Sequence, residues 1–410
     1  MSGVAEVNPK YLAEAASHTV PVGYKQTEVG VIPEDWEVMR LGHLAKFFKG
    51  SGLPKSELSE SGKIKCIHYG QLFTTYGPKI DRVISRTKNV GIVTSQENDV
   101  LMPTSDVTPN GLATASCITE TGVTLGGDIL IIRSDKQKLN GVFFSYLVNV
   151  LRDQVMQLVT GSTVYHLYGS DMAKFEFAFP SKEEQIAIAN ALSDVDALIS
   201  ELEKLIAKKQ AIKTATMQQL LTSRTRLPQF ALREDGTPKG TKPSELGEIP
   251  EDWEVNCFAE CGYFQSGSGF PTKYQGEQEG DYPFFKVSDM NNVGNETFLI
   301  SSNNYISESV KNSISAKVIP ENAIVFAKIG AAIFLERKKI CFQPSCIDNN
   351  MMAYIANEDK LQFKYAYLLF KNINLGQLVE ATALPSLSGR DIGQKIVALP
   401  AAEEQTAIAT

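Results

Sequence analysis

The sequence lacks any apolar run long enough to cross a bilayer. No stretch approaches the roughly 20 uninterrupted apolar residues that a membrane-spanning helix needs. The first residues, MSGVAEVNPKYLAEAASHTV, have no basic start followed by an apolar core, so no secretory signal is expected. Cysteine is also scarce, with six in 410 residues, which is too few for a secreted disulfide scaffold. We therefore expect a cytoplasmic protein with free thiols and no membrane partner.

Positive charge is not in excess. The chain carries 40 Lys and Arg against 47 Asp and Glu, for a formal net charge of -7. Coating nucleic acid unaided requires many clustered cations, so this function is disfavoured, and any DNA binding must be local or shared with a partner. A hydrophobic content of 43% is typical of a globular protein. A chain of 410 residues is long enough for two domains and a connecting element.

Motifs for catalysis are missing. There is no G-x-x-x-x-G-K-[ST] phosphate loop, so ATP hydrolysis by this chain is not expected. The Asn or Asp followed by Pro-Pro-aromatic that clamps the target amine in amino-methyltransferases is absent as well. Cys257 and Cys261, like Cys341 and Cys346, are widely spaced with no histidine near, which favours buried thiols over zinc. We predict no catalytic, cofactor or metal site.

The sequence does contain an internal repeat, and a repeat decides the architecture. The segment EVGVIPEDWEV from Glu28 recurs as ELGEIPEDWEV from Glu245, 217 residues later. Shorter matches join Gly50–Pro54 with Gly267–Pro271, Leu167–Asp171 with Leu387–Asp391, and Pro180–Ala189 with Pro400–Ala409. The edges of the copies match while their middles diverge. This pattern favours a shared frame with different recognition surfaces over simple duplication with drift.

Each copy has the pattern of an α+β domain. Short apolar runs bounded by Gly, Pro, Asn and Asp predict strands at Val100–Met102, Ile129–Ile132, Ile324–Phe326 and Met351–Ile355. Large apolar residues then recur at helical spacing over residues 142–158 and 363–378. The predicted fold is therefore two tandem α+β domains, each of which ends in helix.

A long helix is predicted from Ser181 to about Thr222, where no Gly or Pro interrupts the pattern. At about 1.5 Å per residue it would be about 60 Å long. Ser181 and Glu184 have the spacing of a capping box. Apolar residues that alternate steps of four and three form a coiled-coil seam of Ile188, Leu192, Val195, Ile199, Leu202 and Ile206. Such a helix extends beyond a small domain, so a partner helix is favoured over packing on its own domain.

These patterns divide the chain into six parts. They are an N-terminal extension (1–23), a first domain (24–180), the spacer helix (181–222), a Pro-rich and charged linker (223–244), a second domain (245–400) and the start of a second helix (401–410). The helix of the first copy continues some thirty residues beyond Asn190, whereas the sequence stops at Thr410. We therefore expect a C-terminally truncated chain, in which the second helix is missing after its first turn.

Tandem domains that open with IPEDWEV and close with Pro-x-x-Glu-Glu-Gln resemble the specificity subunit of type I restriction-modification systems. The resemblance runs from about Gly23 onward, on Ile32–Val38 with Ile249–Val255 and on Phe179–Ala189 with Leu399–Ala409. It implies two target-recognition domains, each reading one half of a bipartite, asymmetric site in double-stranded DNA. It also implies a non-catalytic chain whose spacer helix docks two methyltransferase subunits, which motor-nuclease restriction subunits join. S-adenosylmethionine, ATP and Mg²⁺ would then belong to those partners.

Candidates for DNA contact follow from the residue types that read base edges from exposed loops. In the first domain they are Lys49, Ser51, Lys55, His68, Tyr69, Gln71, Thr104, Ser105, Ser162, Thr163, Tyr165 and His166. In the second domain they are Ser266, Ser268, Lys273, Lys286, Ser288, Asp289, Lys328, Thr382 and Ser386. Many exposed polar residues are merely solvated, so only a part of this set is expected to touch DNA.

Two other functions stay open at this point. One is a stand-alone DNA methyltransferase or nuclease, which the absence of catalytic motifs disfavours. The other is a structural coiled-coil protein, which the divergent duplicated domains disfavour. The unpaired seam of the spacer helix could be covered by a second chain, by a separately made helix or by methyltransferase helices. Self-association is the expected outcome for the isolated chain.

Overall fold

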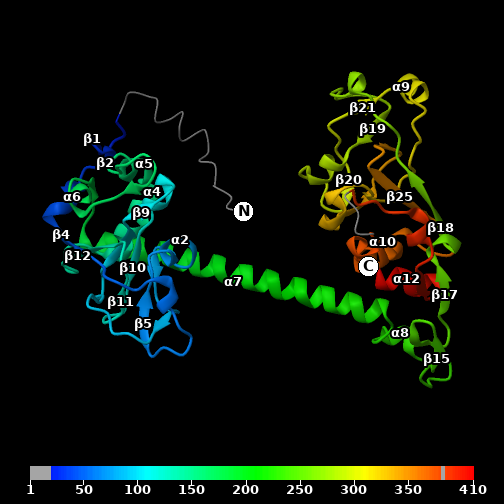
Figure 1. The fold of residues 1–410 in the computed structure, drawn as a ribbon, viewed down its shortest axis with the longest axis horizontal. Coiled ribbons are helices and arrows are strands. Elements are labelled where there is room, and N and C mark those ends of the chain that lie inside the picture. The colour runs from blue at the N-terminus through cyan, green and yellow to red at the C-terminus, as the bar shows by residue number, and fades with distance from the viewer. Residues whose placement is uncertain (1–19, 380–383) are drawn as a thin grey trace. The chain divides into compact units, whose positions relative to one another are not determined.

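The computed structural model describes residues 20–379 and 384–410. The chain forms two compact units: unit 1 ends at Lys204 and unit 2 begins at Leu205 (Figure 1). Both units combine helices and sheets, which confirms the predicted α+β class. The boundary falls inside α7 (Lys182–Leu221), the spacer helix, which has 40 residues. Across the described ranges, every helix is too short or too polar to span a membrane.

Unit 1 is built on a five-stranded sheet and a three-stranded sheet. The first has the order β4 (Ala45–Lys49), β12 (Ile129–Ser134), β8 (Val100–Pro103), β10 (Ser116–Ile118), β6 (Lys79–Ile80). The second has the order β11 (Thr124–Leu125), β5 (Ile64–Ile67), β7 (Arg86–Thr87). Three strand pairs complete the unit: β1 (Tyr24–Thr27) with β2 (Gly30–Pro33), β9 (Ser105–Asp106) with β13 (Tyr165–His166), and β3 (Glu37–Arg40) with β14 (Glu176–Phe179).

The helices of unit 1 before α7 are short. They are α2 (Gln71–Thr74), α3 (Pro109–Leu112), α4 (Gly141–Val150), α5 (Arg152–Met156), α6 (Gly169–Met172) and the 3-10 turns η1 (Leu41–His43) and η2 (Lys55–Glu57). The helix predicted over residues 142–158 is therefore in two pieces. It breaks at Leu151, whose ψ of 36° lies outside the helical region.

Unit 2 repeats this topology. Its sheets have the orders β18 (Gly262–Ser266), β25 (Met351–Ala356), β22 (Ile324–Ala327), β23 (Lys338–Cys341), β20 (Phe298–Leu299), and β24 (Cys346–Ile347), β19 (Tyr282–Phe285), β21 (Tyr305–Ile306). Two strand pairs join β15 (Thr241–Ser244) to β16 (Gly247–Pro250) and β17 (Glu254–Cys257) to β26 (Ile396–Leu399). Parallel and antiparallel pairings in the two main sheets of unit 2 follow those of unit 1. The sequence repeat is thus a structural repeat.

The helices of unit 2 are short as well. They are α8 (Pro228–Ala231), α9 (Glu308–Ser313), α10 (Phe363–Asn372), α11 (Gly389–Gly393) and α12 (Ala402–Ile408), with 3-10 turns η3 (Phe258–Glu260), η4 (Thr272–Tyr274), η5 (Val287–Asn291), η6 (Ala331–Leu335) and η7 (Leu375–Leu378). The helix predicted over residues 363–378 ends at Asn372, and a separate 3-10 turn follows.

The apolar runs that predict strands are continuous because the central sheet is buried on both faces. On β8, Val100 and Met102 pack into one core, while Leu101 between them packs into another. β22 repeats this, with Ile324 and Phe326 on one side. Successive side chains of a strand point to opposite faces, so a strand buried on both faces has no polar position in its interior. All four predicted strands are confirmed.

The two edge motifs of each copy meet in space. In unit 1, β3 pairs with β14, and Nε1 of Trp36 donates to Oε1 of Glu184 at 3.3 Å. In unit 2, β17 pairs with β26, and Nε1 of Trp253 donates to Oε2 of Glu404 at 3.2 Å. In each unit, one strand pair and one indole–carboxylate hydrogen bond hold the closing helix. This shared contact explains why the tryptophan of the opening motif and the glutamate of the closing motif occur in both copies.

The glutamine of each closing motif is buried and hydrogen bonded. Gln185 donates to the carbonyl oxygens of Pro180 at 3.0 Å and Lys138 at 3.2 Å. Its Oε1 accepts from the backbone N–H of Asn140, the residue before α4, at 2.9 Å. Gln405 forms the equivalent bonds in unit 2, with Pro400, Lys360 and Gln362. The glutamine therefore joins the closing helix to the main helix of its unit.

The start of α7 has the predicted capping box. The hydroxyl of Ser181 accepts from the backbone N–H of Glu184 at 3.3 Å, and the Glu184 carboxylate accepts from the N–H of Ser181 at 3.3 Å. Ala401 holds the equivalent position before α12 and makes no side-chain cap. The capping box is thus specific to the first copy, while the glutamine contacts are common to both.

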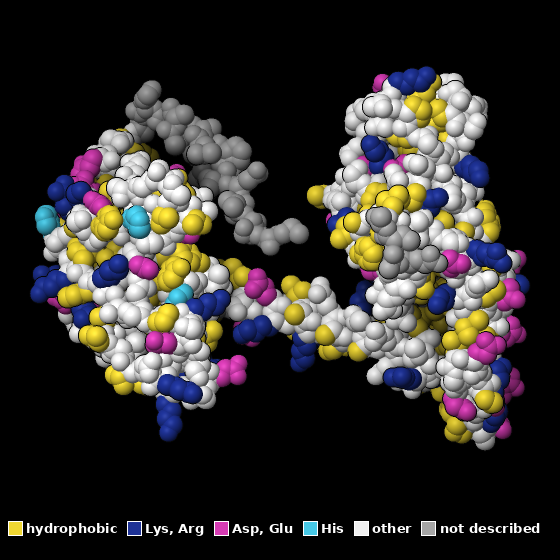
Figure 2. Space-filling view, viewed as in Figure 1, with side chains coloured by type: hydrophobic (Ala, Val, Ile, Leu, Met, Phe, Trp, Pro, Cys, Tyr) yellow, Lys and Arg dark blue, Asp and Glu magenta, His cyan; other side chains and the backbone are white. Residues whose placement is uncertain are grey.

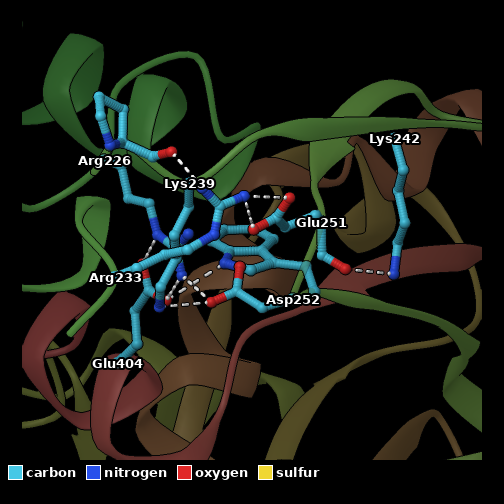
Figure 3. A network of polar contacts seen from close by, with 9 residues as sticks. Arg226, Arg233, Lys239, Lys242, Glu251, Asp252 and Glu404 are labelled. Atoms are coloured by element: carbon cyan, nitrogen blue, oxygen red, sulfur yellow. Dashed lines mark hydrogen bonds and ion pairs between the residues drawn. The ribbon is translucent and has the colours of Figure 1, made fainter. Parts of the chain in front are cut away.

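Beyond its last turn, α7 is tied to unit 2 by an ion-pair network (Figure 3). The guanidinium of Arg226 donates to Glu404 at 2.7 and 2.9 Å and to Asp252 at 2.7 Å. Although burial opposes a charged side chain, hydrogen bonds to Glu404 and Asp252 raise the pKa of Arg226. Since Glu404 also receives the Trp253 indole, the network connects the end of α7 with both edge motifs of unit 2.

Residues 223–244, predicted as a linker, are a folded part of unit 2. They carry α8 and β15, and β15 pairs with β16. Lys239 donates to Asp252 at 2.7 Å, and Arg233 donates to Glu251 at 2.6 and 2.9 Å. Charged residues of this segment form these ion pairs (Figure 3).

Most of the predicted seam on α7 faces solvent. Ile188 packs against the core of unit 1, so the first seam position lies on its own domain. The remaining five, Leu192, Val195, Ile199, Leu202 and Ile206, are between 40% and 56% exposed. The described residues of this chain therefore do not cover the seam.

Candidate nucleic-acid interface

One end of the central sheet in unit 1 forms a cavity of about 500 Å³. It is lined where β4 ends, where β8 leads into β9, and where β13 leads into α6. Four of the predicted DNA contacts line it together: Lys49, Thr104, Ser105 and His166. Lys49 and His166 are 117 residues apart in sequence, yet the fold gathers all four residues at one open site.

The polar groups of this cavity include a cation, a carboxylate and an imidazole. Nζ of Lys49 lies 3.4 Å from Oδ1 of Asp128, and both side chains are well exposed. Oγ of Ser105 is 3.1 Å from Nδ1 of His166, whose ring stacks with Tyr168 at 6.0 Å. An exposed ion pair of this kind is weak, so the lysine remains available to a stronger anion. The arrangement suits recognition of phosphate and base edges rather than proton transfer.

A second group of predicted contacts lies close to the first. His68 interacts electrostatically with both Lys55 and Asp128. Burial and then Lys55 lower its pKa, against an opposing effect of Asp128, so the imidazole is neutral at pH 7. Its Nδ1 accepts from the backbone N–H of Gly70 at 3.1 Å, which makes it a hydrogen-bonding group and not a free base. Tyr69 contacts the imidazole at 4.7 Å between ring centroids.

Other predicted contacts in unit 1 differ in availability. Gln71 is engaged within the protein, because its Oε1 accepts from the N–H of His68 and its Nε2 donates to Ser85. Ser51 is half-buried, and its N–H donates to Leu125. Ser162, Thr163 and Tyr165 lie on and after the loop that leads into β13, and the first two are exposed.

Unit 2 places a lysine and a hydroxyl at the same two positions, but exchanged. In unit 1 the lysine is Lys49, at the end of β4, and Thr104 follows β8. In unit 2 the residue at the end of β18 is Ser266, and Lys328 follows β22. Nζ of Lys328 donates to Oγ of Ser266 at 3.1 Å, so the two positions adjoin. Each unit thus carries one ammonium group at this end of its sheet, presented from a different strand.

The surrounding residues of unit 2 include exposed side chains and others that are hydrogen bonded within the protein. Ser288, Lys273 and Ser386 are exposed, and Nζ of Lys286 donates to Gln275 at 3.0 Å. Oγ of Ser268 accepts from the N–H of Lys317 at 3.0 Å. Thr382 lies outside the described residues.

Asp289 is the predicted contact that the structure places in the interior. It is 0% exposed, and its carboxylate accepts from the N–H of Lys286 and from Asn303. A side chain held in this way orders the η5 segment, so a base contact by Asp289 is not supported. The sequence could not distinguish this residue from the exposed Ser288 beside it.

The sequence reasoning missed three residues of the unit 1 cavity. Asp128 lies at the turn before β12, with a positive φ of 60°. Phe48 and Tyr168 line the cavity with exposed rings. The sequence signal for Tyr168 was the adjacent Gly169, which matches Gly389 in the second copy. A Cβ at Gly169 would lie 2.7 Å from the Cβ of Phe47, so this position requires glycine and places Tyr168 at the cavity.

The side chains that could bind metal or act as thiolates are dispersed or buried in the described ranges. Among these residues, no three His, Cys, Asp or Glu side chains form a group that could hold a metal ion. All six cysteines are free thiols, as predicted. Burial raises the pKa of Cys341 and of Cys346 to about 11, so these thiols are protonated at neutral pH.

The matched edges and divergent interiors agree with comparisons to known proteins. The model of the family described as type I restriction modification DNA specificity domain matches residues 33–214 and 250–410. The chain belongs to this family. The resemblance inferred from the edge motifs is therefore confirmed, and the chain is a type I specificity subunit, which is a non-catalytic component.

Full-length relatives support this assignment. The type I restriction enzyme MjaVIII specificity subunit of Methanocaldococcus jannaschii is 26% identical over 388 residues, which cover 92% of this chain and 85% of that protein. The putative MjaX specificity subunit of the same organism is 25% identical over 411 residues, covering 94% and 88%. The S subunit of a type I system from M. genitalium has the same fold, with a TM-score of 0.56 at 16% identity over 91% of this chain and 87% of that one.

Proposed function

We propose that each unit of this specificity subunit reads one half of a bipartite, asymmetric DNA site. The reading surface of unit 1 is the cavity around Lys49, Thr104, Ser105 and His166, and that of unit 2 surrounds Ser266, Lys328 and Ser386. Phosphate contacts position a protein on the duplex, and contacts to base edges specify sequence. The lysines and the hydroxyl and imidazole groups at these surfaces offer both kinds of contact.

The observation that carries the proposal is the exchange of lysine and hydroxyl between the units. Both sheets have the same strand order, so drift alone would leave any charge pattern at their ends. Instead, each unit has one ammonium group. In unit 1 it lies at the end of the first strand of the sheet, and in unit 2 it follows the third strand. A fixed frame that presents the same chemical group from a new position is suited to reading a different base sequence.

We further propose that α7 spaces the two readers and docks two methyltransferase subunits, which motor-nuclease restriction subunits then join. S-adenosylmethionine, ATP and Mg²⁺ belong to those partners in this proposal. The net charge of -7 supports a DNA complex in which partners supply much of the attraction. The site of action is the cytoplasm, where these partners and DNA meet.

The experiment is to replace Lys49 and Lys328 separately by alanine and map methylated adenines after co-expression with the cognate methyltransferase. Lys136→Ala is the matched control, since Lys136 is an exposed lysine beyond the opposite end of β12, paired with Glu97. We expect Lys49→Ala to relax one half of the recognised site and Lys328→Ala the other. A good direct base contact contributes about 1–3 kcal/mol of discrimination, or roughly 5- to 150-fold.

A loss of methylation that is uniform over all sequences would make these lysines phosphate contacts and remove their part in specificity. If each variant altered both halves of the site, the assignment of one half to each unit would be wrong.

A further inference from the structure

The connection between β22 and β23 carries an exposed apolar tip. Phe334 and Leu335, at the end of η6, are each 55% exposed, and we call this pair the η6 tip. Figure 2 shows apolar side chains on the surface of unit 2 with lysine and arginine side chains among them. In unit 1 the equivalent connection, from β8 to β10, exposes one apolar side chain of comparable type, the smaller Val107. The large apolar tip is therefore a feature of unit 2.

The η6 tip lies at the end of the sheet that carries the candidate DNA contacts. β22 and β23 are antiparallel neighbours, so their connection lies beyond the end of the sheet where Lys328 follows β22. Ile329 then forms a β-bridge with Ser386. Only four residues separate Ile329 from Phe334. Since Lys328 and Ser386 are both candidate DNA contacts, the tip continues the surface that is proposed to read DNA.

The backbone that follows the tip is held in an unfavourable conformation. Glu336 has a φ of 53°, in the left-handed region that is uncommon for residues other than glycine. Its carboxylate accepts from the N–H groups of Leu375 at 3.1 Å and Gly376 at 2.8 Å, and it pairs with Lys338. Lys338 is 2% exposed, and its Nζ also donates to the carbonyl oxygen of Ile373 at 2.7 Å. A left-handed glutamate and a buried charge both cost free energy, and such costs concentrate at functional sites.

The ring of Phe334 is supported by the backbone of η7. A Cβ added at Gly376 would lie 2.8 Å from Cδ1 of Phe334, so the ring lies directly against the main chain there. More than half of the side chain is nevertheless exposed. An aromatic ring that is fixed in this way loses little conformational freedom when it contacts a ligand, which favours binding.

The surroundings of the tip are basic. Lys371 is exposed and Arg337 is half-buried, and both act electrostatically on the nearby Lys339. Neither Arg337 nor Lys371 forms an ion pair with a residue in the ranges 20–379 and 384–410. An apolar surface among cations fits a polyanion that also presents apolar groups. DNA has both, because its phosphates are anionic and the C5-methyl group of thymine projects into the major groove.

We propose that the η6 tip reads thymine: Phe334 and Leu335 contact the C5-methyl group of one thymine in the half-site of unit 2. A methyl group is neither a donor nor an acceptor, so an apolar side chain detects it and a lysine or a hydroxyl group does not. The contact places η6 in the major groove, beside the base edges that Lys328 and Ser386 are proposed to read. This inference rests on the proposed function, because it requires unit 2 to lie on DNA.

The first test maps methylated adenines for Phe334→Ala and for Leu335→Ala, each co-expressed with the cognate methyltransferase. We expect both variants to accept other bases at one position that is thymine for the unaltered chain, within the half-site that Lys328→Ala relaxes. Phe342→Ala is the matched control, because Phe342 is also 55% exposed but follows β23 at the opposite end of the sheet. It should leave the recognised sequence unchanged, and circular dichroism should show all three variants folded. Leu335→Ala keeps the test valid if removal of the Phe334 ring unfolds unit 2.

The second test measures binding of the complex with methyltransferase to duplexes in which each thymine of that half-site is replaced in turn by deoxyuridine. Deoxyuridine lacks only the methyl group and pairs in the same way. We expect one replacement to weaken binding by about 4-fold, the value of one buried apolar carbon. It should have no effect when Phe334 and Leu335 are both alanine. An equal effect on both complexes, or no effect at any thymine, would overturn the proposal.

Other outcomes separate this inference from the proposed function. If methylation falls at all sites while the sequence stays the same, and methyltransferase binds more weakly, the η6 tip is a protein contact and the thymine contact is wrong. If Lys328→Ala relaxes one half-site and neither variant of the tip alters it, only the thymine contact is wrong. If Lys328→Ala relaxes neither half-site, the proposed function itself fails.

Discussion

Replacing Gln185 by alanine tests whether a single buried amide holds the spacer helix to unit 1. The side chain is 0% exposed and forms three hydrogen bonds to backbone groups of Pro180, Lys138 and Asn140. Alanine removes all three and leaves two carbonyls and one N–H without that partner. Each buried backbone group left unsatisfied costs about 1–3 kcal/mol. We expect the free energy of unfolding of unit 1 to fall by about 3–5 kcal/mol, a large share of the 5–15 kcal/mol typical of a folded domain.

The assay is urea unfolding of the full chain, with hydrogen exchange to locate the loss. Exchange should accelerate in β14, α4 and the first turns of α7, while unit 2 keeps its protection. Gln405→Ala should produce the mirror result in unit 2, since Gln405 makes the equivalent bonds. Glu183→Ala is the control, because Glu183 is exposed in the same turn of α7. A loss below about 1 kcal/mol, or equal loss in both units, would refute the reasoning.

Three further predictions concern the ion-pair network around Arg226 and the net charge of the chain. Arg226→Met should destabilise unit 2 by about 3 kcal/mol in urea unfolding, because it leaves the buried Glu404 carboxylate without its cation; an unchanged midpoint would contradict this. Burial opposes ionisation of Asp252, but hydrogen bonds from Arg226 and Lys239 lower its pKa to about 2. Its contribution to the free energy of unfolding of unit 2 is therefore complete above the unfolded-state pKa of about 3.9 and is lost as the pH falls towards 2. Arg226→Met should reduce this loss in an acid titration. Gel shifts should show weak, unselective DNA binding by the isolated chain and tight, selective binding once methyltransferase is added; tight selective binding by the chain alone would contradict the charge argument.

The frame of the fold could be predicted from sequence because its signals are local. Continuous apolar runs indicated the four central strands, and the absence of Gly and Pro indicated a helix that the structure confines to Lys182–Leu221. The two edge motifs identified the repeat. Their contact with each other could not be predicted, because Trp36 and Glu184 are 148 residues apart. The ion pairs of Arg226 and Lys239 could not be predicted either, because their partner Asp252 is brought near them only by the fold.

The interface could be predicted only as a set of residue types. Insertions shift the offset between the copies from 217 at the opening motif to 220 at the closing one, so the interior does not align. For this reason the exchange between Lys49 and Lys328 becomes visible only when the strands are superposed by topology. Burial also depends on residues that are far apart in sequence. It excludes Asp289 from the candidate DNA contacts, whereas the neighbouring Ser288 is exposed and remains a candidate.

The most direct test of the central claim is to exchange residues 24–180 for those of another family member and map the methylated sites in cells that express the cognate methyltransferase. The donor segment must carry its own tryptophan at the position of Trp36 and its own backbone partners for Gln185, so that the new unit docks on the same helix. We predict that one half of the recognised sequence changes while the other half and the spacing stay the same. A change in both halves, or in neither, would contradict the claim that each unit reads its own half-site.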